Sequence, residues 1–330
     1  MNVKFGVFAD LHIDIMHDGE ARMTEFLEAC REEDVDFVVH LGDYVYPNED
    51  RKCICKPENI PANVQSALNG IAQVDKEKIL KMYAEFEKPS YHTIGNHECD
   101  VCSKEQILSY WKQDRAYYSF DKGGVHFVVL DGNYGKVDGK FVSYENGNYF
   151  DFPKSIPYLS DTQLSWLEKD LEETKYPAVL FSHQRLTEGY ASIKNAEDLR
   201  VILKKAPNGV PLAINGHEHR DTLDYVDGTY FLNLNSISCM WVGTKYADLG
   251  KYSAEIDEKF PDIRHVIPYD KPLYTIVTIT DAGAEIKGCK AEFVGKTPDA
   301  LGINEPDSGF VQKGIVITSD IQERFLSFEK

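Results

Sequence analysis

"FADLHID", residues 8–14, closes the apolar run Val3–Phe8 with an aspartate, a histidine and a second aspartate. A buried strand that ends in Asp10 and His12 carries polar groups whose desolvation costs free energy unless a partner compensates it. A metal ion would compensate both groups, because carboxylate oxygens and imidazole nitrogens are common metal ligands. The stretch therefore predicts a first buried strand with a metal site at its carboxyl end.

Similar blocks follow later apolar runs, in "HLGDYV", "TIGNHE", "LFSHQ" and "INGHEH". The polar residues that follow these runs are Asp10, His12, Asp43, Asn96, His97, His183, His217 and His219. Open α/β sheets collect ligands at the carboxyl ends of their strands, so we expect these groups to share one cavity. In extended chain, residues i and i+2 project to the same side, as Asp10 and His12 would. We also expect Gly42, Gly95 and Gly216 to permit tight turns there.

The alternation of strand-like and helical patterns predicts an α/β protein. Strands are expected at 3–8, 37–41, 91–94, 125–133, 178–181, 212–214, 230–234 and 274–279, with helices between most of them. Ser103 with Gln106, and Ser160 with Gln163, read as capping boxes. Without an internal repeat or linker, 330 residues of which 42% are apolar favour one elaborated domain. We expect a domain at 1–294 with rim insertions near 46–74, 134–158 and 240–270, and a C-terminal extension at 295–330 packed on it.

The formal net charge of −18 argues against a partner of polymeric nucleic acid, which usually meets a basic face. A small anionic ligand is compatible where a local positive charge receives it. The chain starts without a secretory signal and has no apolar run of membrane-spanning length, so we expect a cytoplasmic protein without a membrane partner. The sequence carries no signal for an oligomeric state.

The seven cysteines favour reduced thiols over a disulfide framework in such a compartment. Cys53 with Cys55, and Cys99 with Cys102, follow two of the ligand blocks, so their loops are expected at the same edge of the sheet. The alternative to reduced thiols is that these four cysteines bind a structural zinc ion or form disulfides there.

The order of these blocks resembles that of the calcineurin-like metallophosphoesterase superfamily, whose pattern is D-x-H, G-D, G-N-H-[DE], H and G-H-x-H. The resemblance spans roughly Val3 to His219, with weaker support to about Val294. It implies a four-layer α/β/β/α sandwich of two mixed sheets.

The resemblance also implies the site. One metal ion would be held by Asp10, His12 and His219, a second by Asn96, His183 and His217, and Asp43 would bridge them. The mixture of nitrogen and oxygen ligands suits Mn, Fe or Zn. His97 would contact the phosphate and help to protonate the leaving alkoxide, while a metal-bridging hydroxide attacks in line.

Within the superfamily, "GHEH" at 216–219 and the stretches 117–133 and 160–171 look like one branch. That branch contains class III cyclic-nucleotide phosphodiesterases and manganese-dependent ADP-ribose/CDP-alcohol diphosphatases. It implies hydrolysis of a phosphodiester or phosphoanhydride in a small, nucleotide-like substrate. A phosphomonoesterase and a catalytically silent binding module are the alternatives. A protein phosphatase is disfavoured, because Tyr46 and Pro47 replace an Asp-Arg pair and Ile94 replaces the arginine before Gly95.

Other polar and aromatic residues have open or structural interpretations. We expect structural roles for His40, His92, His126 and His265. The roles of Asp14, His17 and Glu98 stay open between support of the site and an ordinary loop position. Tyr44, Asn133 and Arg185 are candidates to line the pocket, where Arg185 would be able to donate two hydrogen bonds to a phosphate. Tyr46, Tyr149, Trp241 and Tyr246 are candidates to stack on a base.

Overall fold

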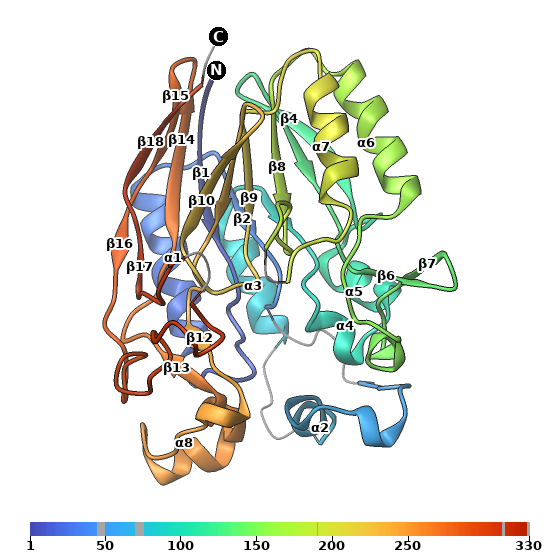
Figure 1. The fold of residues 1–330 in the computed structure, drawn as a ribbon. Coiled ribbons are helices and arrows are strands. Elements are labelled where there is room, and N and C mark those ends of the chain that lie inside the picture. The colour runs from blue at the N-terminus through green and yellow to red at the C-terminus, as the bar shows by residue number, and fades with distance from the viewer. Residues whose placement is uncertain (45–49, 70–75, 190, 312–313, 329–330) are drawn as a thin grey trace.

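The computed structural model describes residues 1–44, 50–69, 76–189, 191–311 and 314–328, and its strands form two six-stranded sheets that face each other (Figure 1). The first sheet has the order β18-β15-β14-β1-β2-β3. Its strands are β1 (Asn2–Phe8), β2 (Phe37–His40), β3 (Ser90–His92), β14 (Thr275–Thr280), β15 (Gly283–Ile286) and β18 (Arg324–Ser327). β1, β2 and β3 are parallel, whereas β14 pairs antiparallel with β1, so the sheet is mixed.

The second sheet has the order β10-β11-β9-β8-β5-β4 and is mixed in the same way. Its strands are β4 (Tyr118–Lys122), β5 (Val125–Val129), β8 (Ala178–Ser182), β9 (Leu212–Asn215), β10 (Thr222–Val226) and β11 (Thr229–Asn233). The four central strands run parallel, and the antiparallel strands β4 and β10 form the edges.

Aromatic side chains from both sheets fill the space between them. Phe5 stacks on Phe37 at 5.0 Å within the first sheet, and both rings meet the edge of Phe127 from the second sheet. Phe127 in turn stacks on Phe181 at 5.7 Å. Such offset and edge-to-face contacts are favourable arrangements for rings, and they hold the two sheets face to face.

Helices cover the outer faces, which completes four layers. α1 (Gly19–Glu32), α3 (Lys76–Phe86) and α5 (Lys104–Trp111) share a hydrophobic core with the outer side of the first sheet. α6 (Asp161–Glu173) and α7 (Ala196–Lys205) share one with the second sheet. The predicted α/β/β/α sandwich is confirmed.

The shorter elements mostly surround the carboxyl ends of the parallel strands (Figure 1). They are α2 (Ala62–Leu68), α4 (Glu98–Val101), α8 (Ala254–Lys259), β6 (Tyr134–Val137), β7 (Lys140–Ser143), β12 (Cys239–Trp241), β13 (Val266–Pro268), β16 (Cys289–Lys290), β17 (Asp320–Ile321) and four 3-10 turns, η1 (Pro57–Asn59), η2 (Asn148–Asp151), η3 (Thr244–Tyr246) and η4 (Pro261–His265). Among the helices of the described ranges, none is long and apolar enough to cross a membrane.

Of the two predicted capping boxes, one is complete and one is half formed. Ser103 accepts a bond from the backbone N–H of Gln106, whose side chain bonds back to Ser103. Ser160 likewise caps α6, but the Gln163 amide instead bonds both backbone groups of Asp131. The prediction of a second full box was wrong because a buried loop offered Gln163 two other partners.

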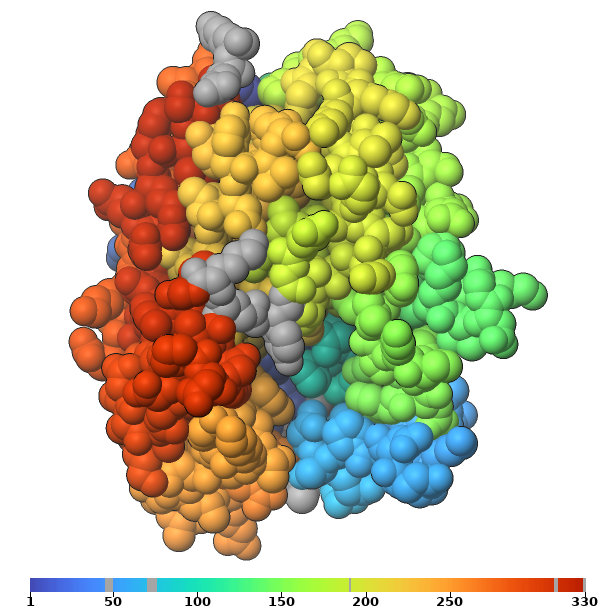
Figure 2. Space-filling view, viewed as in Figure 1, coloured from blue at the N-terminus to red at the C-terminus, as the bar shows by residue number. Residues whose placement is uncertain are grey.

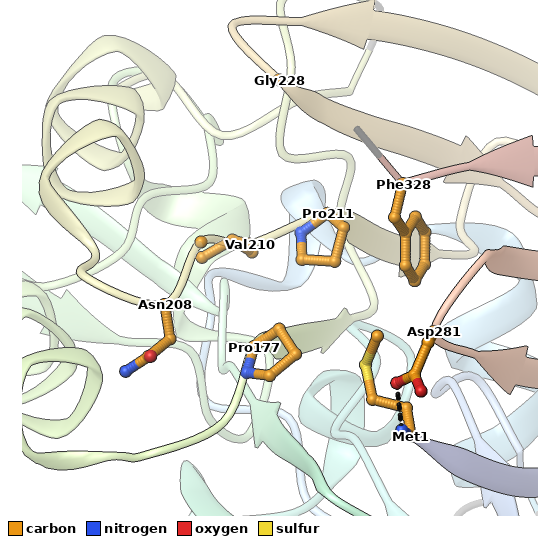
Figure 3. Close-up of a pocket in the computed structure, with 9 residues that line it drawn as sticks. Met1, Pro177, Asn208, Val210, Pro211, Gly228, Asp281 and Phe328 are labelled. Atoms are coloured by element: carbon orange, nitrogen blue, oxygen red, sulfur yellow. Dashed lines mark hydrogen bonds and ion pairs between the residues drawn. The ribbon is translucent and has the colours of Figure 1, made fainter. Parts of the chain in front are cut away.

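The two ends of the described chain meet at the far end of the sheets from the carboxyl ends of the parallel strands. A hollow of about 300 Å³ there is bordered by Met1 and Phe328, with Pro177 and Pro211 opposite them (Figure 3). The N-terminal amino group of Met1 pairs with Asp281. The C-terminal end reaches this place through β18, which forms an edge of the first sheet by pairing with β15.

Candidate metal centre and active site

Two clusters of metal-binding side chains lie side by side where the parallel strands of both sheets end. One consists of Asp10, His12 and His219, and the other of Asp43, His183 and His217. In each cluster, one ligand atom from every residue lies within 4.8 Å of the others. Each cluster draws on both sheets, because the loops after β1 and β2 belong to the first sheet and those after β8 and β9 to the second.

Asp43 lies between the clusters. Its Oδ2 is 3.1 Å from His183 Nε2 and 4.0 Å from His12 Nε2. His183 Nε2 is also 3.0 Å from His217 Nδ1 and 3.1 Å from Asn96 Oδ1. In the other cluster, His219 Nε2 is 3.4 Å from Asp10 Oδ1 and 3.3 Å from His12 Nε2. The structure thus brings together all seven residues that the sequence predicts as ligands.

The donor set of these residues fits metal ions. His183 Nδ1 donates to the carbonyl of Leu41 at 2.8 Å, and His219 Nδ1 donates to that of Cys239 at 2.7 Å. These bonds leave each Nε2 lone pair aimed at carboxylates and other imidazoles, an arrangement that a cation stabilises. Nitrogen and oxygen donors in this mixture suit Zn, Mn or Fe.

The backbone at the site is unusual, because five of the seven residues have a positive φ. The angles are 56° at Asp10, 46° at His12, 55° at Asp43, 75° at His217 and 50° at His219. Non-glycine residues rarely adopt this left-handed conformation, which costs free energy and is concentrated at functional sites. The expectation of an extended chain was therefore wrong: left-handed turns aim Asp10 and His12 at one point.

The glycines beside the ligands serve the site in two ways. Gly42 has a φ of 91° and makes a tight turn, as expected. Gly95 and Gly216 lack a positive φ and instead leave room for carboxylates. A Cβ at Gly95 would lie 2.1 Å from Asp43 Oδ1, and one at Gly216 would lie 2.7 Å from Asp10 Oδ2.

The electrostatics favour the ligand forms that bind cations. Burial lowers the pKa of His12 and of His217 to about 3, which keeps both rings neutral. Burial would raise the pKa of Asp43, but the neighbouring His183 and His97 hold it well below its ordinary value. The pKa of His183 rises to about 9 against the effect of burial, because Asp43 attracts a proton to the place that a cation would take.

Glu98 fixes the backbone of two loops that carry metal-binding residues. It is buried, and its carboxylate accepts backbone N–H bonds from Gly95 at 2.8 Å, Asp43 at 3.2 Å and Tyr44 at 2.5 Å. These bonds tie the loop after β2 to the loop after β3. Of its two open interpretations, the structure supports the one in which Glu98 orients neighbouring groups.

Arg185 also stabilises a loop of the site, and its guanidinium is bonded to neighbouring side chains of the protein. Its guanidinium donates to Glu218 at 2.9 Å, to Thr187 at 2.9 Å and to Asp224. Glu218 stands between the ligands His217 and His219, so the ion pair fixes their loop. The candidate role of Arg185 in gripping a phosphate is wrong for this arrangement, because the protein already uses these donors.

Several other sequence candidates lie away from the metal centre. Tyr44 is buried under the first sheet with its hydroxyl on Met23. Asn133 is buried and bonds Ile94 and Gln184. His17 packs on Tyr252 at 4.3 Å. Asp14, in contrast, lies close enough to His97 to interact with it electrostatically, and burial raises the pKa of its carboxyl to about 7.

The four histidines expected to be structural also lie outside the two clusters. His40 and His92 pack against Trp111, His126 lies between Asp121 and Asp170, and His265 faces Asp262.

The metal centre opens into a cavity of about 570 Å³. Figure 2 shows a hollow beside the blue helix α2 on this face, and Asn63 of α2, Ala191 and Ser308 border the cavity. Its lining residues include His12, His97, Asn63, Arg220, Trp241 and Phe310. Of the base-stacking candidates, Trp241 lines the cavity, Tyr246 packs on Phe310, Tyr149 is buried elsewhere, and Tyr46 lies outside the described residues.

Two groups of residues that contribute to the site were not predicted from the sequence. Asp100 accepts a bond from His97 Nδ1 at 2.7 Å; its position three residues after His97, one helical turn on, was an available signal. Ser308, Gly309 and Phe310 line the cavity from the C-terminal segment, for which the sequence pattern gave no signal.

The cysteine pairs do not build a third metal cluster. Cys53 Sγ lies 3.0 Å from Cys55 Sγ, and Cys99 and Cys102 are buried nearby in the same hydrophobic core. Within the described ranges, however, no group of three thiols or more meets the spacing of a metal site. The expectation of ordinary thiols fits this arrangement better than that of a structural zinc.

Two clusters of nitrogen and oxygen ligands, joined by one carboxylate at the edge of two facing mixed sheets, define a class of two-metal proteins. The chain belongs to the calcineurin-like phosphoesterase family, whose model matches residues 3–221. It is a metal-dependent phosphoric ester hydrolase, and the family implies two metal ions.

One solved structure supports the fold, and two others match with lower scores. A dimetal phosphatase from Danio rerio is 15% identical, with a TM-score of 0.58 over 89% of this chain and 99% of that one. The anchor protein GAP50 of Plasmodium is 14% identical, with a TM-score of 0.49 over 100% and 90%. A putative 5'-nucleotidase from Staphylococcus aureus is 14% identical, with a TM-score of 0.46 over 90% and 55%. A comparison with curated proteins gave no match.

Proposed function

We propose that the protein hydrolyses a phosphodiester or phosphoanhydride bond of a small, nucleotide-like molecule. The observation that carries this proposal is the pair of ligand clusters joined by Asp43, with His97 beside them and one cavity above. Two ions about 4 Å apart stabilise the attacking and leaving oxygens of an in-line displacement.

The ligands fall into two sets. Asp10, His12 and His219 would hold one metal ion, and Asn96, His183 and His217 would hold a second. Asp43 would be shared by both ions, because its Oδ2 faces histidines of both sets. Mn, Fe and Zn are the ions that this donor set favours.

His97 supplies the proton for the leaving oxygen. Its backbone N–H donates to Asp43 Oδ1 at 2.9 Å, which fixes the residue beside the ligands. Because Nδ1 is bonded to Asp100, Nε2 on the other side of the ring faces the cavity. An imidazole held this way is suited to general acid catalysis.

The cavity favours a substrate with a flat group. Trp241 stands over the centre, its ring 5.7 Å from that of His97 and inclined by 30°. Its indole offers a surface for a base. A volume of about 570 Å³ lies within the range of small-molecule sites.

The composition supports the remaining part of the proposal. Among the described residues, none of the seven cysteines forms a disulfide, which suits the reducing cytoplasm. A net charge of −18 disfavours polymeric nucleic acid as a partner. We therefore place the protein in the cytoplasm, acting on a small phosphate ester.

The decisive experiment compares the wild type with Asp43→Asn after loading with Mn. Bis-para-nitrophenyl phosphate and para-nitrophenyl phosphate are assayed in parallel, and bound metal is counted. We expect turnover of the diester and a loss of at least about 100-fold in Asp43→Asn, because the bridging charge is gone. Asp138→Asn, at a hairpin turn away from the cavity, is the matched control and should keep full activity.

The other outcomes separate the alternatives. Preference for the monoester would replace the proposal with a phosphomonoesterase. Failure to hydrolyse either ester, or nucleotide diphosphates and cyclic nucleotides, with both metals bound would favour a binding module.

A further inference from the structure

A buried chain of hydrogen bonds lies behind His97. His97 Nδ1–H donates to Asp100 Oδ2 at 2.7 Å, and the Tyr149 hydroxyl donates to Asp100 Oδ1. Asp100 is 0% exposed and Tyr149 is 6% exposed, so water does not compete for these bonds. Each carboxylate oxygen of Asp100 thus has a partner.

Burying a carboxylate this deeply costs desolvation free energy, unless its hydrogen bonds compensate that cost. An apolar residue at position 100 would pack against the same core without that cost. The arrangement Tyr149–Asp100–His97 is therefore better explained by what it does to the ring of His97 than by stability.

The segment that carries Tyr149 is fastened to the helix that carries Asp100. Asn146 N–H donates to the carbonyl of Cys102 at 2.9 Å, and Gly147 N–H donates to that of Cys99 at 2.8 Å. A Cβ at Gly147 would lie 2.8 Å from the Asp100 carbonyl oxygen, so the two backbones are in close contact. The ring of Tyr149 stacks on that of Tyr144 at 4.3 Å, with 17° between the planes.

We propose that Tyr149 is a positioning residue for hydrolysis, acting through Asp100 on His97. By donating to Asp100, Tyr149 fixes the carboxylate, which accepts from His97 Nδ1–H and orients the ring so that Nε2, with the proton that it transfers, is directed into the cavity. The proposal rests on the proposed function, in which His97 protonates the leaving oxygen. In this proposal, the segment 134–158 carries a residue that supports the proton donor His97 from the Nδ1 side of its ring.

The test is a double-mutant cycle of Tyr149→Phe and His97→Ala in the full chain. Tyr149→Phe keeps the stacked ring and removes only the hydroxyl. The matched control is Tyr144→Phe, because the Tyr144 hydroxyl is buried without a hydrogen-bond partner in the described part of the chain. The substrates are methyl para-nitrophenyl phosphate, with a good leaving group, and methyl phenyl phosphate, with a poorer one.

We expect Tyr149→Phe to lower kcat on the phenyl ester about tenfold, the usual effect of one hydrogen bond to a charged group. The loss should be smaller on the nitrophenyl ester, whose leaving oxygen needs a proton less. In the His97→Ala background, Tyr149→Phe should cost nothing further, because it acts through His97. Tyr144→Phe should leave kcat unchanged.

Additive losses in the double variant, or equal losses on both esters, would overturn the proposal in favour of a merely structural role. If His97→Ala itself leaves both rates unchanged, the proton-donor role of His97 fails, and with it the basis of this inference.

A spectroscopic measurement tests the positioning independently of turnover. In zinc-loaded protein labelled with ¹⁵N-histidine, the ring signal missing from His97→Ala identifies His97. We expect the signal of an Nδ1–H that is hydrogen-bonded to Asp100 in the wild type and in Tyr144→Phe, and a changed signal in Tyr149→Phe. An unchanged signal in Tyr149→Phe would overturn the proposal even if no substrate is hydrolysed.

Discussion

The metal centre leaves no space for a side chain at Gly95. A Cβ there would lie 2.1 Å from Asp43 Oδ1, 2.2 Å from the Asp43 backbone nitrogen and 2.7 Å from Glu98 Oε2. Two of these atoms belong to Asp43, and the third belongs to the side chain that fixes its backbone. A methyl group would therefore displace Asp43, whose carboxylate faces histidines of both clusters.

We predict that Gly95→Ala lowers the free energy of unfolding by about 3 kcal/mol and removes bound metal, because overpacking forces backbone shifts. Urea unfolding and metal analysis measure both effects. Gly139→Ala is the control: its Cβ meets nothing within 4 Å, so it pays only the strain of a φ of 78°, about 1 kcal/mol. Equal effects of the two changes would contradict this account.

At the residue scale, the sequence predicted which side chains converge but not how they do so. The ligands were recognisable because each follows an apolar run in a block of fixed order. The left-handed φ of His217 was not recognisable, since even the residue types enriched in this conformation, histidine among them, adopt it rarely, and the surrounding fold imposes it. The roles of Glu98 and Arg185 depended on partners 55 and 33 residues away, which no local pattern names.

Within the second sheet, His126 joins three elements. Its Nδ1 pairs with Asp121 on β4 at 2.6 Å, and its Nε2 pairs with Asp170 on α6 at 2.9 Å. Burial would lower the pKa of His126, but hydrogen bonds from the imidazole to Asp170 and Asp121 raise it above its ordinary value. The folded protein therefore holds this proton more tightly than the unfolded chain does.

This shift gives the stability a definite pH dependence. The contribution of His126 is fully present below the unfolded pKa of about 6.5 and is lost as the pH rises through the higher folded pKa. We predict that the difference in unfolding free energy between the wild type and His126→Gln shrinks as the pH rises above about 6.5. Urea unfolding across pH measures it.

His265→Gln is the matched control for this prediction. Burial lowers the pKa of His265, so its pH dependence lies below about 6.5 and its effect should stay constant above that. A growing difference for His126→Gln at high pH would contradict the role of the two carboxylates.

At the element scale, long apolar runs were predictable and short exposed strands were not. β1, β2, β8 and β14 lie within a residue or two of their predicted ranges, because each buries most of its side chains. β5 ends at Val129, four residues before the predicted end, where the chain turns into the loop of Asp131. β4 was not predicted, since its half-exposed residues carry no run of apolar side chains.

In the whole molecule, metal ions would join the two sheets. Each ligand cluster takes residues from loops of both sheets, so a bound ion is a link across the sandwich that the unfolded chain lacks. Ligands that bind only the folded state stabilise it according to their free concentration.

We predict that chelation lowers Tm and that Mn restores it. At about 100 times its Kd, one ion adds about 2.7 kcal/mol to the free energy of unfolding. Thermal unfolding at stepped Mn concentrations measures the effect, with Asp43→Asn expected to respond weakly and Asp138→Asn like the wild type. A Tm that is unaffected when the chelator has removed the metal would contradict the link between the sheets.

At this scale, the sequence predicted the four layers from alternating elements and from the order of the ligand blocks. It did not predict that residues 308–310 line the cavity, because their position depends on how the C-terminal segment packs on β12 and β13. That contact is made by isolated apolar side chains, such as Ile303 and Ile317 against Met240 and Ile267, that form no periodic pattern.

The hollow shared by Met1 and Phe328 has a practical consequence. Seven residues of β1 separate it from the loop of Asp10, about 23 Å in extended chain. A fusion partner or surface tether joined at either end therefore projects away from the mouth of the cavity. Because the ends adjoin, a short linker can connect them, and a circularly permuted chain can open at the protruding Asp138–Gly139 turn (Figure 1). Such a permutant would keep every ligand on its own strand while offering new attachment points on another side of the enzyme.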